Sequence, residues 1–585
     1  MRGLILASMA ALVLSGLPPA PPAPLAAQPA ARAPLDDPDA ICAPFIEGYQ
    51  AEYRDRVGAG RSGRRIGGMA PPPPPPPMMP GPLVAQEQAA TGAVRAAPAA
   101  PMGRPYPGAN RERYAGEDVA QVQAVADAPV STFGVDVDTG SYANVRRMLT
   151  QGQMPPQAAV RTEEMLNYFR YDYPRPADRS RPFTITTDLT TTPWNDNSRL
   201  LRVGLRGYDA PHEGRPPANL VFLIDVSGSM ESVDKLPLVQ CSLALLAQRL
   251  ERRDRVAIVV YAGAAGLVLP STSSRSDVIG AIKRLRAGGS TAGAAGIQLA
   301  YRVARDNLIQ GGINRVILAT DGDFNVGVTD NEALVDLVER EREAGVTLTT
   351  LGFGTGNYNE AMMEQIADHG NGNYSYIDSP REAQKVLDQE LASTLFTIAQ
   401  DVKIQVEFNP AYVSEYRLIG YENRLLAEQD FDNDAVDAGD IGAGHQVTAL
   451  YEIVPAGGRG WLPQRRYEEN RRDASGSGNG ELAFLRLRYK LPGERESRLI
   501  EQPVHAGLLR GARAPGGDSA FAAAVAAYGQ LLRGDTNLGG FTFADVRRLA
   551  AAARADDFWR REFLSLTELA ERQQLAAVRP EGRKR

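Results

Sequence analysis

The sequence predicts an α/β fold with a doubly wound, mostly parallel sheet, flanked by β-rich segments and followed by a C-terminal helical segment. The first indication is a series of short, continuously apolar stretches, beginning with Asn219–Asp225. Such a run is typical of a strand buried on both faces of a parallel sheet, because a sheet with one wet face alternates polar and apolar residues. The second indication is that helical stretches separate these runs at the spacing of βαβ units.

The α/β domain is predicted to span residues 217–400. After the first strand, further strands are expected at Arg255–Tyr261, Asn314–Asp321, Val346–Phe353 and Tyr374–Ile377. Helices are expected at about Lys235–Arg252, Ser276–Leu285, Ala292–Asn307, Asn331–Glu343 and Pro380–Phe396. Strand and helix therefore alternate through the whole segment, as a doubly wound sheet requires.

The flanking segments have a different pattern. Residues 130–216 form an expected α+β region, and residues 401–585 are expected to be β-rich at first and then helical. The first region should contain a strand and turn at Ser131–Ser141, helices at Tyr142–Gln151 and Arg161–Phe169, and a hairpin of Phe183–Leu189 with Arg199–Leu205. In the second, strands are expected at Val402–Phe408, Gln446–Ile453 and Leu482–Lys490, and Ala-rich helices at Ser519–Arg533 and Phe543–Arg572.

Residues 1–28 have the pattern of a signal peptide. Arg2 precedes the apolar stretch Leu4–Leu17, and Leu25-Ala26-Ala27 supplies small residues at a cleavage position. The apolar stretch is short for a bilayer span and prolines follow it, so we expect export to the periplasm, cell envelope or exterior, with no transmembrane helix in the mature chain. The alternative is an uncleaved segment that serves as a membrane anchor.

Residues 29–129 are predicted to be a disordered linker rich in proline and alanine. The segment includes the uninterrupted run Pro71–Pro77, which favours extended, semi-rigid chain. A short polar piece, Phe45–Val57, is the one part with a helical pattern. The linker is expected to act as a spacer before the folded part.

Charge and cysteine content exclude several classes of protein. The formal net charge is −6 over 585 residues without a block of lysine and arginine, which speaks against a nucleic-acid partner. The sequence contains no zinc-like grouping of its cysteines and histidines, and no Walker loop or G-x-S-x-G motif. Cys42 and Cys241 could pair in an oxidising compartment, but we favour the interpretation of Cys241 as a small buried apolar residue of a helix.

The most informative residues lie where the predicted strands end. Asp225, Ser227 and Ser229 alternate in a turn directly after the first strand, and Asp321 follows the strand of residues 314–321. Thr291 closes a glycine turn just before a helix. Sites in doubly wound sheets form at the carboxyl ends of strands where the strand order reverses, and carboxylate and hydroxyl oxygens suit a hard cation such as Mg²⁺.

These five positions, in this order, resemble the metal-ion-dependent adhesion site of von Willebrand factor type A domains. The resemblance extends over about Pro217–Ala399. The flanks resemble a bacterial YfbK-like group of exported proteins that contain this domain. That second resemblance rests on Phe133–Tyr142, Glu163–Tyr168, Leu201–Gly207, Arg486–Lys490 and Arg561–Ala570.

The resemblance implies a non-enzymatic binding or adhesion protein. In such domains an Asp or Glu of a partner protein completes the octahedron around Mg²⁺ or Mn²⁺. If hydroxyls and water fill most of the inner shell, the ion keeps enough positive charge to attract that carboxylate. The partner itself is not identified by the sequence.

The sequence is also compatible with other functions. One is a structural envelope protein that assembles without metal, and another is a metal-dependent hydrolase with Glu231 or Asp323 as general base. Asp136-Val-Asp138-Thr-Gly also resembles the loop of an aspartic protease, but the sequence has no second such loop to share a proton. We therefore interpret this segment as a structural turn, with a second ion at Asp136 and Asp138 as the alternative.

Overall fold

The structure is a computed structural model that describes residues 37–61, 112–209, 215–289, 293–322, 331–389, 393, 395–463, 480–553 and 557–578. At residues 52–61, 331, 388–389 and 577–578 it describes the backbone alone. The predicted signal peptide, most of the predicted linker, Thr291 and Asp323 lie outside the described residues.

The central domain has a six-stranded sheet in the order β10-β9-β8-β5-β6-β7. The strands are β5 (Ala218–Asp225), β6 (Arg255–Tyr261), β7 (Ala265–Thr272), β8 (Ile313–Thr320), β9 (Thr347–Phe353) and β10 (Tyr374–Ile377). Neighbouring strands run parallel except for the antiparallel pair β6 and β7. The doubly wound, mostly parallel fold is confirmed. The edge strand β7 was not predicted, because its mostly half-exposed residues have no clear apolar run.

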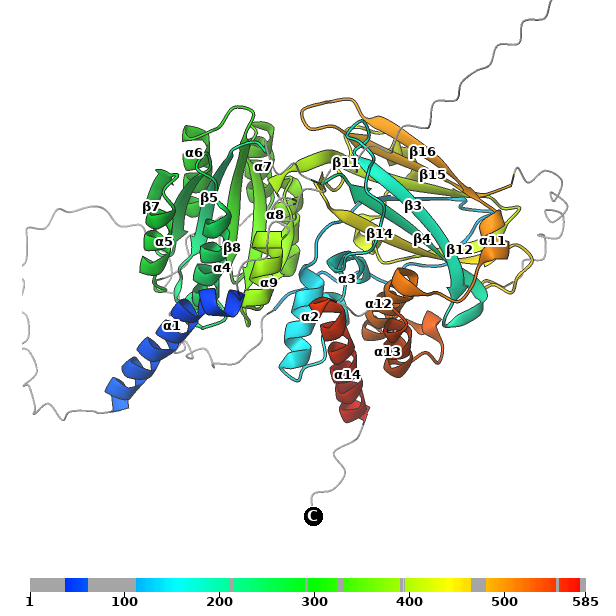
Figure 1. Cartoon of the computed structure of the whole chain (residues 1–585), viewed down its shortest axis with the longest axis horizontal. Helices are drawn as coiled ribbons and strands as arrows, with labels where there is room; N and C mark the ends of the chain where they lie inside the picture. The colour runs from blue at the N-terminus through cyan, green and yellow to red at the C-terminus, as the bar shows by residue number, and fades with distance from the viewer. Residues whose placement is uncertain are drawn as a thin grey trace, which may run out of the picture. The chain divides into compact units, whose positions relative to one another are not determined.

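Helices cover both faces of this sheet (Figure 1). They are α4 (Leu236–Arg249), α5 (Arg275–Arg284), α6 (Gly293–Asp306), α7 (Asn331–Glu343), α8 (Glu360–His369) and α9 (Pro380–Gln384), which a π-helical turn, Lys385–Gln389, extends. Alternate residues of β5 enter opposite cores. Phe222 packs into the core that contains α4 and α5, and Leu223 into the core that contains α6, α7 and α8. All of β5 is buried, which explains its unbroken apolar sequence.

The segments before and after the central domain form two antiparallel sheets together. One has the order β1-β12-β14-β4-β3 and the other β13-β11-β15-β16, with β2 also paired to β11. The strands are β1 (Gln123–Ala124), β2 (Val130–Gly134), β3 (Phe183–Thr192), β4 (Asn195–Gly207), β11 (Thr397–Phe408), β12 (Val413–Ile419), β13 (Ile441–Gly442), β14 (Gln446–Pro455), β15 (Glu481–Lys490) and β16 (Arg498–His505). Because β4 pairs with β14 and β2 with β11, each sheet combines strands that precede the α/β domain in the sequence with strands that follow it. One apolar core joins the two sheets.

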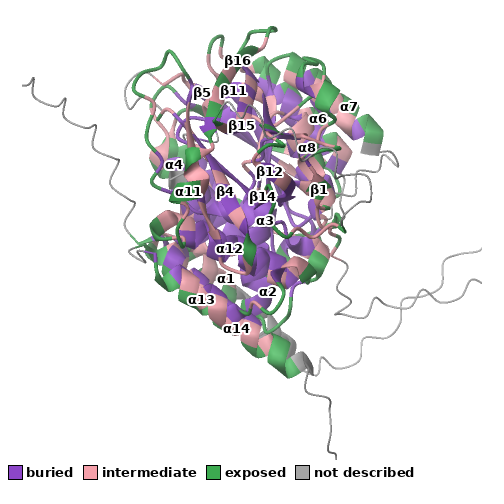
Figure 2. Ribbon diagram, turned by 90° about the vertical axis from the view of Figure 1, so that its right-hand side faces the viewer, coloured by how far each residue is buried: buried purple, intermediate pink, exposed green. Residues whose placement is uncertain are grey.

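Five helices contribute to a further core beside these sheets. They are α2 (Gly140–Thr150), α3 (Thr162–Tyr168), α12 (Gly517–Arg533), α13 (Phe543–Ala551) and α14 (Phe558–Val578). In Figure 2, α2, α3 and α12 are mostly buried, whereas α13 and α14 have many intermediate and exposed residues. The last predicted helix, Phe543–Arg572, is two helices rather than one, since α13 ends at Ala551 and α14 begins at Phe558. A short helix, α11 (Gly507–Gly511), follows β16.

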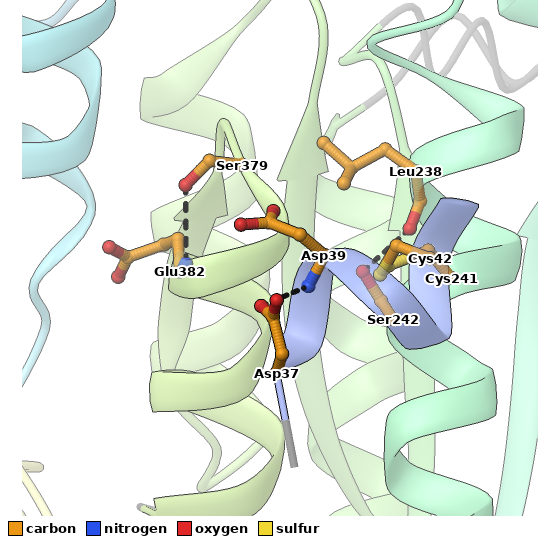
Figure 3. The surroundings of a disulfide bond; sticks show 8 residues. All are labelled: Asp37, Asp39, Cys42, Leu238, Cys241, Ser242, Ser379 and Glu382. Atoms are coloured by element: carbon orange, nitrogen blue, oxygen red, sulfur yellow. Dashed lines mark hydrogen bonds between the residues drawn. A yellow bond between two sulfur atoms is a disulfide. The ribbon is translucent and has the colours of Figure 1, made fainter. Parts of the chain in front are cut away.

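Parts of the predicted linker are ordered. Helix α1 (Pro38–Arg61) packs against α4 and α9, and residues 112–122 lead into β1. A disulfide joins Cys42 of α1 to Cys241 of α4, and both cysteines are fully buried (Figure 3). The preference for an unpaired Cys241 is therefore wrong, although its burial was expected. The two cysteines are 199 residues apart in the sequence, so no local pattern indicated that they are close in space.

In the part of the chain that the structure describes, no helix combines the length and the apolar character needed to cross a membrane.

Candidate metal-binding site

Asp225 is the last residue of β5, and its side chain is buried at the carboxyl edge of the sheet. Strand β8 runs parallel to β5 with Ala319 opposite Ile224, so both strands end at this edge. Asp321, also fully buried, follows β8 directly. The strand register thus brings two carboxylates from positions far apart in the sequence to one edge of the sheet.

The Asp225 carboxylate is held by hydrogen bonds on both oxygens. The backbone N–H of Ser227 donates to Oδ1 at 2.8 Å, while the hydroxyls of Thr320 and Tyr261 donate to Oδ2 at 3.1 and 3.3 Å. Burial raises the pKa of Asp225 to about 6, and the charge of Asp321 adds to the rise while the bonds from Ser227 oppose it. A cation at this edge would remove the cost of keeping the carboxylate ionised.

Ser227 and Ser229 lie on the same turn with their Oγ atoms 2.9 Å apart. The turn is tied to the glycine loop after α5, because Gly228 N donates to Gly289 O at 3.0 Å and Gly288 N donates to Val226 O at 2.8 Å. Two hydroxyl oxygens are therefore held together beside Asp225. The glycine loop leads toward Thr291, which lies outside the described residues.

The structure also places a lysine at this site, which the sequence interpretation missed. Lys235 Nζ donates to Asp321 Oδ2 at 2.7 Å, and the two side chains are only 7% and 0% exposed. Gly354 makes room for it, since a Cβ on that glycine would lie 2.2 Å from Lys235 Cγ. One feature of the sequence could have pointed to Lys235. It lies at the start of a predicted helix, where the helix dipole disfavours a cation unless an anion faces it.

The turn that carries Asp321 is packed closely against the loop between β9 and α8. Gly322 has a φ of +86°, and a Cβ at this position would lie 2.5 Å from the backbone nitrogen of Asn359. Gly322 N also donates to Thr320 Oγ1 at 3.2 Å. The left-handed conformation and the close approach both require glycine here.

The donor set fits a small, hard cation. Asp225 and Asp321 supply carboxylate oxygens, and Ser227 and Ser229 supply hydroxyls, which are ligands that Mg²⁺ and Mn²⁺ accept. Within the described ranges, no group of three or more His, Cys, Asp or Glu side chains could hold a metal. A cation at the edge of this sheet would therefore depend on hydroxyl oxygens.

The other candidate residues that the structure describes are Asp136, Asp138 and Glu231, and the two aspartates have hydrogen bonds that stabilise a turn. Asp138 Oδ1 accepts from Tyr374 N at 2.9 Å, and Asp136 Oδ1 accepts from Asp138 N at 3.0 Å, so this turn connects β2 to β10. Both aspartates also lie 3.4 Å from a guanidinium nitrogen of Arg424. Glu231 is exposed at the end of the short 3-10 turn Gly228–Glu231, which also contains Ser229.

Asp136 and Asp138 belong to a larger group of acids, most of them buried, between α8, α3 and the β2–α2 turn. We call this group the interface carboxylates: Asp136, Asp138, Glu163, Glu164, Glu360, Glu364 and Asp368. The first six are buried, whereas the Asp368 side chain is 34% exposed. Two guanidinium groups contact members of the group, those of Arg161 and Arg424. The six buried acids of this group cannot all be ionised at low cost when two arginines face them.

Glu360 is the extreme member of this group. It is fully buried, and neither carboxyl oxygen has a hydrogen-bond partner among the described residues. Burial raises its pKa to about 8; the charges of Glu364 and Glu163 add to the rise, and Arg161 opposes it. Glu360 is thus expected to be protonated at neutral pH.

Family models match three consecutive parts of the chain. A model described as von Willebrand factor type A domain matches residues 219–389. A model described as von Willebrand factor matches residues 108–202, and one described as Uncharacterized protein YfbK, C-terminal, matches residues 393–573.

Relatives are similar over very different lengths. The uncharacterized protein YfbK of Escherichia coli (strain K12) is 48% identical over 469 residues, which cover 78% of this chain and 81% of the relative. The uncharacterized protein sll0103 of Synechocystis sp. is 32% identical over 189 residues, covering 32% of this chain and 44% of the relative. The solved structure of the ArnB paralog VWA2 from Sulfolobus acidocaldarius gives a TM-score of 0.32 at 17% identity, covering 67% of this chain and 98% of that one.

Proposed function

The chain belongs to the YfbK family and contains a von Willebrand factor type A domain, and on this basis we propose that it is a non-enzymatic binding protein of the bacterial cell envelope. It would capture an acidic group, from an Asp or Glu of a partner protein, through Mg²⁺ or Mn²⁺ held by Asp225, Ser227, Ser229, Thr291 and Asp321.

The observation that carries the proposal is the convergence of oxygen atoms at one edge of the sheet. Asp225, Ser227 and Ser229 lie on one turn, and Asp321 follows the neighbouring parallel strand. When bound, the cation would supply an electrophilic point for a carboxylate from outside. The chain's own residues would hold the cation, and the rigid β5 and β8 strands would keep their oxygens in place.

The disulfide supports the envelope location. Structural disulfides persist in oxidising compartments such as the periplasm or the exterior, and are rare in the cytosol. Cys42 and Cys241 are paired and buried, which agrees with the signal-like pattern of residues 1–28.

The test is a pull-down from envelope extract with the purified mature chain, in Mg²⁺ and in excess chelator. We expect a partner that is retained with Mg²⁺ and released by chelator. The variants Asp225→Ala and Thr291→Ala should lose it while their circular dichroism stays unchanged. Asp306→Ala is the matched control, because Asp306 is an exposed aspartate at the end of α6 in the same domain.

Two outcomes would contradict the proposal. Undiminished binding by both site variants, or in chelator, would favour a structural envelope protein that assembles without metal. Turnover of a peptide or ester panel that depends on Mg²⁺ would favour a hydrolase instead.

A further inference from the structure

Lys235 is a charged side chain that the proposed metal site does not explain. It lies at the start of α4, where its backbone N–H donates to Ser232 O at 3.1 Å and its carbonyl accepts from Val239 N at 2.9 Å. Its ammonium reaches Asp321 Oδ2 at 2.7 Å. We infer that Lys235 is a built-in counter-charge that weakens metal binding at this site and in return strengthens the capture of an external carboxylate.

The surroundings hold the lysine in this position. Its stem runs against Gly354, where any Cβ would overlap Cγ, Cδ and Cε, and Gly354 O accepts a hydrogen bond from Tyr376 OH at 2.6 Å. The Lys235 side chain is 7% exposed, and the Asp321 carboxylate that it faces is fully buried. The ammonium is therefore confined next to a proposed metal ligand, in surroundings where charges are weakly screened.

A count of charges gives the consequence. Asp225 and Asp321 together carry two negative charges, which would neutralise a divalent cation completely. Lys235 cancels one of them, so the site with its metal would keep a net charge of about +1. That remaining charge lowers the affinity for the metal and attracts a carboxylate from a partner. This inference rests on the proposed function, because it assumes that the oxygens of the site bind a metal.

The experiment measures Mn²⁺ binding to the full chain by the loss of the free-ion signal in electron paramagnetic resonance. It compares the wild type with Lys235→Met, which keeps an unbranched apolar stem as far as Cε and removes the charged amino group. Lys283→Met, an exposed lysine on α5 of the same domain, controls for the change in net charge. We expect Lys235→Met to bind Mn²⁺ at least tenfold more tightly, and Lys283→Met to bind as the wild type does.

The second readout uses acetate as the external carboxylate. Bound Mn²⁺ broadens the resonance of [13C]acetate that comes close to it, and at equal Mn²⁺ occupancy we expect at least threefold less broadening with Lys235→Met than with the wild type. Circular dichroism checks the fold, and Lys235→Gln repeats both measurements with a polar neutral side chain.

The outcomes separate the two proposals. If the wild type binds Mn²⁺ and both neutral variants bind it equally or more weakly, the role of Lys235 is wrong and the metal site stands. If none of the proteins binds Mn²⁺, the proposed function itself fails and the inference fails with it. If the neutral variants bind Mn²⁺ and the wild type does not, Lys235 blocks the metal site, and both the proposed function and the role of Lys235 in capturing a carboxylate are wrong.

Discussion

Replacement of Glu360 by glutamine should stabilise the protein at alkaline pH. Glu360 is the interface carboxylate whose two oxygens are buried without hydrogen-bond partners among the described residues. Its pKa is raised from 4.5 to about 8, with burial as the main cause. At any pH above the pKa that Glu360 has in the unfolded chain, folding must therefore either protonate this carboxyl or bury its charge, and both cost free energy.

The magnitude follows from linkage. A group whose pKa is raised on folding contributes stability that is fully present below its unfolded pKa and is lost as the pH rises through its folded pKa. With a pKa of 4.5 in the unfolded chain and of about 8 in the folded chain, Glu360 lowers the free energy of unfolding by about 4 kcal/mol at pH 8 and by about 1 kcal/mol at pH 5. Glutamine resembles the protonated acid and does not titrate. We expect Glu360→Gln to raise the free energy of unfolding by about 2–4 kcal/mol at pH 8, since neighbouring acids share part of the effect, and by about 1 kcal/mol or less at pH 5.

Urea unfolding followed by circular dichroism, at pH 5 and pH 8, measures the effect. The matched control is Glu364→Gln, one turn further along α8. Glu364 accepts from Arg161 at 2.7 Å and from Asn423 at 2.9 Å, so the same substitution removes a buried ion pair and should destabilise the protein at pH 8. The reasoning is refuted if Glu360→Gln is less stable than the wild type at pH 8, or if the two have the same dependence on pH.

Three further predictions concern other parts of the chain. Replacing both Cys42 and Cys241 by alanine should lower the free energy of unfolding by about 2–5 kcal/mol, because the bond closes a loop with a sequence separation of 199 residues; an unchanged urea midpoint would contradict this. Arg417→Met should cost about 3–5 kcal/mol, because the guanidinium is 1% exposed and pairs with two buried carboxylates that would remain uncompensated; a melting temperature within one or two degrees of the wild type would refute it. Gly322→Ala should weaken Mn²⁺ binding at least tenfold and cost about 1–3 kcal/mol of stability, since its φ is +86° and a Cβ would collide with the backbone of the β9–α8 loop; wild-type values in both assays would show that the turn tolerates a side chain.

Local patterns were enough to predict the central domain and to place Asp225, Ser227 and Ser229 at the end of β5. The unbroken apolar run of β5 results from burial on both faces, and a strand that ends in Asp225 places that carboxylate at the edge of the sheet. The alternation of Ser227 and Ser229 in the following turn is equally local. These features repeat over a few residues, so they are visible in the sequence itself.

The tertiary structure alone decided which distant residues meet. The bond between Cys42 and Cys241, the pairing of β4 with β14, and the contact of Lys235 with Asp321 all join positions that no periodic pattern connects. An exposed lysine and a buried, paired lysine are the same letter in a sequence, and only the packing around Gly354 distinguishes them. The chain encodes its strands locally, but the charge balance at the site depends on which residues the completed fold brings together, because electrostatic interactions depend on distance in space and on burial.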